Sequence, residues 1–298
     1  MSDQQYPPVC DYEGSGYRQD FWENQGRDYE DRVERVVLRR VLPPHGRRVL
    51  EIGAGFGRLT NELAGYDHVV LLDYSRTLLQ DARARLGDGR YTYVAADVYR
   101  IPFQSGSFDG ATMIRVLHHM ADVPRALQQI RQVLAPGATF VLEYANKRNL
   151  KAVLRYALRR QDWNPGTLEP VEFVPLNFDF HPDYMLMAMR DAGFEVTRRL
   201  PVSYFRLGAL KRLVPTGALV ALDRALQDWA PLYSPSVFTV NRAVGEGPDC
   251  VAAPLAFRCP TCGADLAPDG EALHCTGEAC GLRWGKREGI WDFKEPLR

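Results

Sequence analysis

One segment constrains the fold of this chain more than any other. Residues 48–52 form a short, largely apolar run, and glycines follow at alternate positions: Gly53, Gly55 and Gly57. Such a run predicts a buried strand, and the glycines predict a tight turn whose backbone can approach a ligand closely. In an open α/β sheet, ligands bind at this end of the strands. The glycine loop (residues 53–57) therefore predicts a ligand site at the carboxyl edge of a sheet.

The regions on either side of the glycine loop alternate between strand-like and helix-like patterns. Apolar runs predict strands at 48–52, 68–72, 91–96, 108–115, 139–144, 194–200 and 236–242. Apolar residues at helical spacing predict helices at 21–42, 58–64, 75–86, 122–134, 147–160 and 182–192. This alternation is typical of βαβ units. The expected fold is a Rossmann-like, doubly wound α/β domain with a mostly parallel, seven-stranded sheet.

Changes in pattern divide the chain into four parts. We expect an N-terminal arm and covering helix at 1–46, the sheet domain at 47–245, a linker rich in glycine and proline at 246–254, and a small unit at 255–298. Within the sheet domain, residues 147–181 and 203–232 are expected to form a helical lid. Residues 147–160 carry six basic residues and no acid, and 203–232 are rich in leucine.

Composition disfavours several classes of protein. The 37 basic and 37 acidic residues give a net charge of zero, which disfavours a protein held to nucleic acid mainly by its phosphates. No apolar stretch approaches the roughly 18 residues of a membrane-spanning helix. The first residues lack the basic and apolar runs of a signal peptide, so a cytoplasmic location is expected.

The glycine loop has a form that distinguishes between ligands. A dinucleotide-binding loop needs its third glycine at position 58, where this chain has Arg58; here Glu51 precedes the glycines in the pattern E-x-G-x-G-x-G. This pattern resembles motif I of the class I S-adenosylmethionine-dependent methyltransferases, in particular the methyltransferase type 11 or UbiE-like group. Residues 70–75, 94–98, 108–119 and 131–137 resemble later segments of that family, in the same order.

The resemblance implies S-adenosylmethionine as methyl donor, with S-adenosylhomocysteine as product. In this family an acid at the position of Asp73 grips both ribose hydroxyls, and one at the position of Asp97 accepts from the adenine amino group. Tyr29 resembles a tyrosine near the methionine end of the donor; it is equally consistent with a half-buried aromatic on a covering helix. The donor-binding residues implied in this way are Glu51, Gly53, Ala54, Gly55, Gly57, Asp73, Tyr74, Asp97, Val98, Arg115 and Tyr29.

Two adjacent histidines are the candidate catalytic residues. His118 and His119 follow the fourth predicted strand, and either can act as a base if the acceptor must lose a proton. The alternative is that both histidines only cap or pack. The expected activity is methyl transfer to O, N or C of a small molecule, lipophilic or anionic in character. An RNA methyltransferase that uses its C-terminal unit as an accessory module, and a donor-binding regulator without catalysis, remain alternatives.

The C-terminal unit contains four cysteines at the spacing of a zinc site. Cys259 and Cys262 form one pair, and Cys275 and Cys280 form the other. Four thiolates on two turns are the ligands of a closed, structural Zn²⁺ site, which a segment this small needs for stability. The segment resembles the Trm112-like zinc ribbons, which partner methyltransferases. This resemblance implies that the ribbon contacts the catalytic domain or a protein partner.

Overall fold

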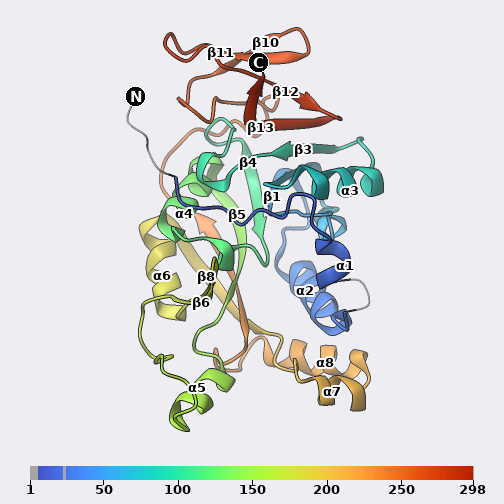
Figure 1. The fold of residues 1–298 in the computed structure, drawn as a ribbon, viewed down its shortest axis with the longest axis vertical. Helices are drawn as coiled ribbons and strands as arrows, with labels where there is room; N and C mark the ends of the chain where they lie inside the picture. Colours follow the sequence, from blue (N-terminus) through green and yellow to red (C-terminus); the bar gives the residue numbers. More distant parts are fainter. Residues whose placement is uncertain (1–5, 23–24, 298) are drawn as a thin grey trace.

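The computed structural model describes residues 6–22 and 25–297. Within them, one sheet has the strand order β10-β11-β12-β13-β3-β2-β1-β4-β5-β9-β8, and β6 and β7 form a separate hairpin (Figure 1). The strands are β1 (Gly46–Ile52), β2 (Tyr66–Asp73), β3 (Tyr91–Ala95), β4 (Phe108–Met113), β5 (Leu134–Ala145), β6 (Val171–Val174), β7 (Asn177–Asp179), β8 (Phe194–Val202), β9 (Ser236–Ala243), β10 (Leu266–Asp269), β11 (Ala272–Cys275), β12 (Arg283–Arg287) and β13 (Ile290–Leu297).

Helices flank this sheet. They are α1 (Tyr17–Phe21), α2 (Asp28–Val41), α3 (Arg76–Leu86), α4 (Val123–Val133), α5 (Leu150–Ala157), α6 (Pro182–Asp191), α7 (Gly208–Leu213) and α8 (Thr216–Leu226), with 3₁₀ turns η1 (Thr60–Leu63), η2 (Val98–Arg100) and η3 (Leu117–His119). Among the helices described here, none is both long and apolar enough to cross a membrane.

The centre of the sheet is parallel and buried on both faces. β1 pairs in parallel with β2 and β4, and these pair in parallel with β3 and β5. Leu50 packs into the core formed with α4 and α6, whereas the neighbouring Val49 packs on the opposite face with α3. This alternation follows from the two-residue period of a strand. β9 lies antiparallel between β5 and β8, so the Rossmann-like α/β architecture expected from the sequence is confirmed.

Two predicted helices are shorter than expected. In place of a helix at 58–64, the glycine loop leads into the single 3₁₀ turn η1, because its polar groups are used locally: the amide of Gly57 donates to Ala54 O at 2.9 Å. The helix expected at 147–160 is confined to α5, because Asn149 caps its start through the amide of Ala152. The lid segment 147–181 also contains the β6–β7 hairpin, so it is not purely helical.

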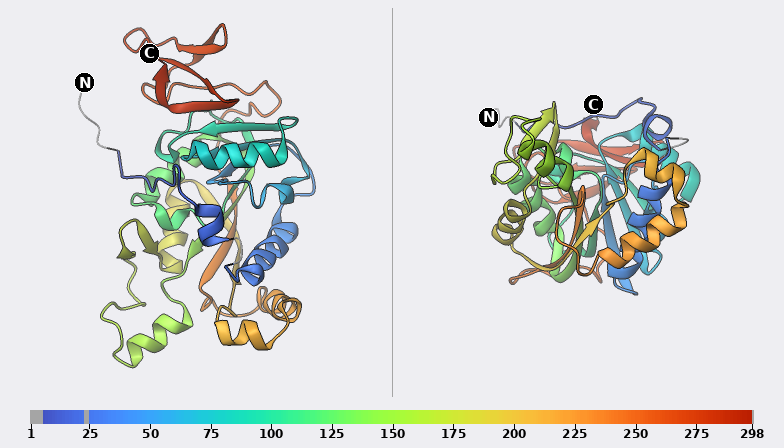
Figure 2. Two further views of the ribbon diagram at one scale, coloured as in Figure 1. Left: turned by 45° about the vertical axis from the view of Figure 1, so that its right-hand side comes forward. Right: turned by 90° about the horizontal axis from the view of Figure 1, so that it is seen from below.

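The expectation of a seven-stranded sheet is wrong, because the C-terminal unit extends the sheet. β13 pairs in parallel with β3, with Trp291 opposite Val94 and Asp292 opposite Ala95. Four strands of the C-terminal unit thereby continue the seven strands from β3 to β8 (Figure 2). Without β13, β3 would expose a row of unpaired backbone groups, and pairing with the ribbon satisfies them. Alternation of apolar residues along one chain does not reveal this pairing.

Candidate active site

The glycine loop turns sharply between β1 and η1. Gly53 and Gly55 have φ of 67° and 53°, in the left-handed region that favours glycine. A Cβ on Gly53 would come within 2.1 Å of Val116 Cγ2, whereas a Cβ on Gly55 would meet no atom within 4 Å. The first glycine therefore permits close packing inside the protein. The second keeps the space beside the loop open for a ligand.

Asp73 ends β2 and lies directly against this loop. Its Oδ2 accepts from the amide of Gly55 and its Oδ1 from the amide of Ser75, both at 2.8 Å. Burial raises the pKa of Asp73, although these two amides partly offset the effect. The carboxylate is thus held in one orientation with acceptor capacity left for a ligand, since each oxygen can accept more than one hydrogen bond.

Glu51 is a second buried carboxyl group, at the end of β1. Its Oε2 accepts from Thr60 Oγ1 at 2.6 Å. Burial raises the pKa of Glu51 to about 7, an effect that the Thr60 hydroxyl and the charge of Arg58 only partly offset. The residue therefore fastens β1 to η1 behind the glycine loop.

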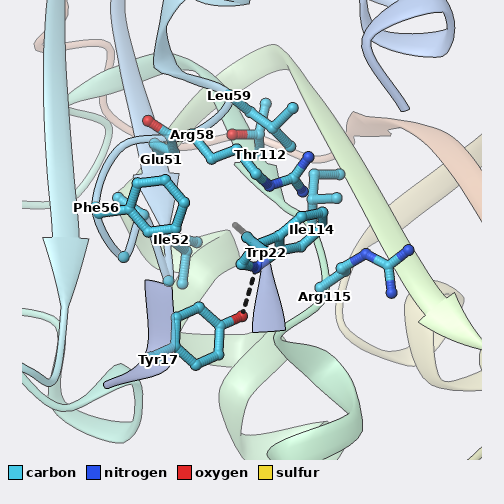
Figure 3. A pocket seen from close by; sticks show the side chains of 13 residues that line it. Tyr17, Trp22, Glu51, Ile52, Phe56, Arg58, Leu59, Thr112, Ile114 and Arg115 are labelled. Atoms are coloured by element: carbon cyan, nitrogen blue, oxygen red, sulfur yellow. Dashed lines mark hydrogen bonds between the residues drawn. The ribbon is translucent and has the colours of Figure 1, made fainter. Parts of the chain in front are cut away.

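Two cavities meet at the glycine loop. One encloses about 450 Å³ and the other about 630 Å³, including the solvent at their mouths. Tyr17, Ile52, Gly53, Gly55 and Arg115 line both, so the cavities form two lobes of one elongated site. The first lobe also contains Trp22, Glu51, Ala54, Phe56, Arg58, Leu59, Thr112 and Ile114 (Figure 3). The second also contains Val9, Cys10, Tyr12, Leu72, Asp73, Tyr74, Leu78, Ala96, Val98, Val116, His119 and Met120.

The N-terminal arm covers both lobes. Tyr12 and Tyr17 line the second lobe, and Trp22 Nε1 donates to Tyr17 Oη at 3.4 Å beside the first (Figure 3). Glu13 fixes the arm to the start of α3, where its carboxylate accepts from the amides of Arg76 and Thr77 at 2.8 and 3.1 Å. None of these arm residues was predicted from the sequence to belong to the site. The concentration of tyrosine in the first 20 residues was the available signal.

A network of buried charges borders the first lobe. Arg115 Nε donates to Glu34 Oε1 at 2.6 Å, and its amide donates to Glu143 Oε2 at 2.9 Å. Arg115 has φ of 59°, unusual for a residue with a side chain, and the two acids hold it there. Burial alone would lower the pKa of Arg115, but the charges of Glu34 and Glu143 outweigh this effect and raise the pKa above its usual value. The guanidinium therefore stays charged.

The two candidate histidines have different surroundings. His119 is hydrogen-bonded through both ring nitrogens: Nδ1 donates to Leu176 O at 2.9 Å, and Nε2 lies 3.2 Å from Tyr12 Oη. It therefore links the arm to the turn between β6 and β7. His118 has a pKa well below its usual value, because of burial and the nearby charges of His119, Arg115, Arg206 and Arg27. Its ring is therefore neutral at neutral pH and is a weaker base than a free imidazole. Of the two histidines, His119 is the one that lines the second lobe.

Two residues expected to bind the donor have internal partners. Tyr29 of α2 is 1% exposed, and its hydroxyl donates to Asp223 Oδ2 of α8 at 2.5 Å. It is not among the described residues that line the two lobes. Asp97 caps η2 through the amide of Tyr99 at 2.9 Å, and its neighbours Ala96 and Val98 line the second lobe. Tyr29 is thus a core residue in the structure, and Asp97 orders the chain behind the lobe.

The four cysteines of the C-terminal unit gather at one point. The Sγ atoms of Cys259, Cys262, Cys275 and Cys280 all lie within 4.8 Å of one another. The distances are 3.7 Å from Cys259 to Cys280 and 3.2 Å from Cys262 to Cys275, close to the about 3.8 Å expected between sulfurs around a tetrahedral zinc. The residues therefore fit a closed four-thiolate metal site.

The sheet, the glycine loop and the acid at the end of β2 have the arrangement expected of a class I methyltransferase domain. Comparison with known proteins agrees: residues 50–142 match the family described as "Methyltransferase domain". The O-methyltransferase cnsE of Penicillium expansum is 37% identical over 133 residues, which cover 41% of this chain and 48% of that protein. The ubiquinone/menaquinone biosynthesis C-methyltransferase UbiE of Vibrio parahaemolyticus is 28% identical over 60% of this chain and 71% of its own length.

The fold is also similar to that of solved structures. A complex between the Haloferax volcanii Trm112 methyltransferase activator and a putative methyltransferase contains a chain that matches with a TM-score of 0.56 and 19% identity. The match covers 77% of this chain and 96% of that one. The chain spans about half the length of the first curated relatives that it matches, at 48% and 47%. The comparisons thus match residues 50–142 to a methyltransferase domain and show that the fold is shared with a solved methyltransferase complex.

Proposed function

We propose that this protein transfers a methyl group from S-adenosylmethionine to a small molecule. The observation that carries the proposal is the two-lobed site joined at the glycine loop, with Asp73 held against it. An elongated donor fits such a site with its ribose beside Asp73, its adenine toward Ala96 and Val98, and its methionine end toward Arg115. The relatives named above, an O- and a C-methyltransferase, support this class of reaction.

We infer that His118 is the base that activates the acceptor, because hydrogen bonds already occupy both ring nitrogens of its neighbour His119. The donor is a sulfonium, so the reaction is an in-line displacement that needs a correctly positioned nucleophile. An acceptor O–H or acidic C–H gives its proton to the neutral His118 ring. The freed electron pair then forms the bond to the methyl carbon as the carbon–sulfur bond breaks, which leaves S-adenosylhomocysteine. His119 is a positioning residue, because hydrogen bonds occupy both of its ring nitrogens.

The charge around His118 favours an acceptor that becomes an anion. Arg206 lies close enough to lower the pKa of His118, and its Nη2 donates to Ser236 Oγ at 2.7 Å. Its Nε is buried with no hydrogen-bond partner among the described residues. A guanidinium with an unused, buried N–H stabilises a negative oxygen. We therefore infer an acceptor of the phenol, enol or carboxylic acid class, small and partly apolar.

The C-terminal ribbon acts as a built-in stabiliser of the donor site. Its last strand extends the sheet beside β3, and Lys294 Nζ lies 4.0 Å from the ring centre of Tyr74, which lines the second lobe. Zinc bound by the four cysteines would hold the ribbon folded. The activator named in the Haloferax volcanii complex supports such a role, here supplied within one chain. An RNA acceptor is not favoured, because residues 251–298 contain six basic and seven acidic residues.

Calorimetry with S-adenosylhomocysteine tests donor binding, and transfer of labelled methyl from S-adenosylmethionine into a cell extract tests catalysis. We expect saturable binding and a labelled product of low mass; tight binding without any product would favour the regulator alternative. His118→Asn should lower kcat at least about 100-fold, the usual contribution of a general base, with unchanged donor affinity. Arg206→Met should abolish any preference for 4-nitrophenol over the neutral 4-nitrobenzyl alcohol as test acceptors.

A further inference from the structure

Helix α5 exposes an apolar ridge that none of the residues described by the structure covers. Leu150 and Leu154 of α5, and Leu158 that caps its C-terminus, follow one another at four-residue intervals on one side, and they are 53%, 52% and 63% exposed. Ala152 is the one buried residue of α5. Single exposed leucines are ordinary on a protein surface, but three in a row on one helix form a contiguous patch.

Basic residues border this ridge. Lys151 and Arg155 lie one turn apart beside the leucines, and Arg159 and Arg160 follow at the end of the helix; all four are exposed. The stretch 147–160 contains no acid. The first acids after α5 lie on the loop and hairpin that follow it, at Asp162, Glu169 and Glu172. The helix therefore presents leucines and cations together.

The structure fixes α5 in place at its base. Lys147 is 2% exposed, and its Nζ donates to Thr167 O at 3.0 Å and to Glu169 O at 2.5 Å. The amide of Leu150 donates to Tyr233 O at 2.8 Å. Because buried hydrogen bonds hold its start, α5 is a rigid projection rather than a loose end, and its leucines do not fold back onto the domain.

The helix lies at the end of the molecule opposite the ribbon, together with α7 and α8 (Figures 1 and 2). There Leu207, just before α7, and Leu213, its last residue, are 71% and 83% exposed. α5 follows β5 and α7 follows β8, and these two strands run in the same direction because both pair antiparallel with β9. Both patches therefore follow the carboxyl ends of strands, the edge that carries the glycine loop.

We propose that α5 binds the surface of an anionic lipid bilayer. A helix with leucines on one face and lysine or arginine beside them inserts its apolar side chains at the headgroup boundary, while its cations contact anionic headgroups. RNA would use the cations but gain little from exposed aliphatic leucines, because bases stack on aromatic rings or guanidinium planes. A bilayer uses both halves of the patch. A lipophilic acceptor could then be taken from the membrane, a consequence that rests on the proposed function, whereas the membrane contact does not.

Co-sedimentation of the full-length protein with vesicles tests the proposal. We expect binding to phosphatidylcholine vesicles that contain 30% phosphatidylglycerol, and at least about tenfold weaker binding to phosphatidylcholine alone. Leu154→Ser/Leu158→Ser should weaken binding about tenfold or more through lost apolar burial. Arg155→Gln/Arg159→Gln should weaken it about 30-fold at low salt, since each basic residue near the surface contributes about 1 kcal/mol.

Matched substitutions at other exposed positions are the controls. Met187→Ser removes an apolar side chain that is 52% exposed on α6, and Arg47→Gln/Arg190→Gln removes two exposed arginines; neither should change binding. Equal binding to both kinds of vesicle, or full binding by the Leu154→Ser/Leu158→Ser variant, would overturn the proposal. So would retention on RNA or on an acidic protein without binding to anionic vesicles. Because this assay needs neither donor nor acceptor, failure of the methyltransferase proposal would leave its outcome unaffected.

Discussion

Glu13 joins three distant parts of the chain beside the donor site, so its replacement should weaken donor binding. Its carboxylate accepts from the first two amides of α3, and Lys294 Nζ of the ribbon lies 3.4 Å from its Oε2. Thr77 Oγ1 also donates to it. The Tyr12 and Tyr17 side chains on either side of Glu13 line the second lobe. Loss of these bonds releases the arm that covers the donor.

The magnitude follows from the contacts. Removal of capping hydrogen bonds costs about 1 kcal/mol, loss of an anion at a helix N-terminus about 0.5 kcal/mol, and loss of a partly exposed ion pair about 0.5 kcal/mol. The total of about 2 kcal/mol corresponds to a Kd for S-adenosylhomocysteine that is about 30-fold higher in Glu13→Ala, if closure of the arm is fully coupled to binding. Glu13→Gln keeps an acceptor oxygen, so about fivefold is expected.

Isothermal titration calorimetry at pH 7 measures these changes, with Glu246→Ala, a substitution of an exposed glutamate outside this region, as the control. Burial raises the pKa of Glu13, but bonds from Thr77 and the amides of Arg76 and Thr77 outweigh it and lower the pKa to about 2. The contribution is therefore complete above about pH 4.5 and is lost as the pH falls through 2. A Kd within twofold of wild type in Glu13→Ala, with native circular dichroism, would refute this role of Glu13.

Three further predictions concern the donor site and the ribbon. Asp73→Asn should raise the Kd for S-adenosylhomocysteine about 10- to 100-fold, because charge-assisted hydrogen bonds are lost. Calorimetry measures this change, with Asp67→Asn at an exposed position as the control. An unchanged Kd would contradict the ribose assignment. Metal analysis should find about one zinc per chain. The Cys262→Ser variant should lose the metal and have a lower Tm than the control Cys10→Ser. A natively folded protein without metal would exclude the zinc site. Burial raises the pKa of Glu51 to about 7, so its contribution to the free energy of unfolding should be complete below about pH 4.5. This free energy should fall by about 3 kcal/mol as the pH rises to 7. Urea unfolding should show no such loss in Glu51→Gln.

Much of the site could be inferred from local sequence because its parts are local. The glycines at 53, 55 and 57 follow β1 and the acid at 73 ends β2, and a parallel sheet necessarily brings the carboxyl ends of neighbouring strands together. The four cysteines are likewise two short pairs. Boundaries were less predictable: the helix expected at 58–64 is a single 3₁₀ turn, because the loop amides find partners nearby.

Residues joined across long separations were beyond sequence reasoning. Tyr29 has the residue type of a donor contact, yet it is used to bind Asp223, which lies 194 positions away. His118 and His119 are adjacent and chemically identical, but it is His119 that is hydrogen-bonded to Leu176 and to Tyr12 of the arm. Which role each takes depends on the segments packed around it, and a single sequence does not specify that packing.

The sequence by itself determined the α/β class of the domain, the glycine loop and the cysteine cluster, because each depends on residues close together in the chain. The tertiary structure alone decided that the ribbon continues the sheet at β3, that Glu13 fixes the arm to the start of α3, and that the leucines of α5 stay exposed. Those features depend on backbone pairing and burial between segments up to 281 residues apart, as between Glu13 and Lys294. Hydrogen bonding of a strand edge and removal of apolar surface from water act between whatever segments the fold brings together, so only the folded chain reveals them.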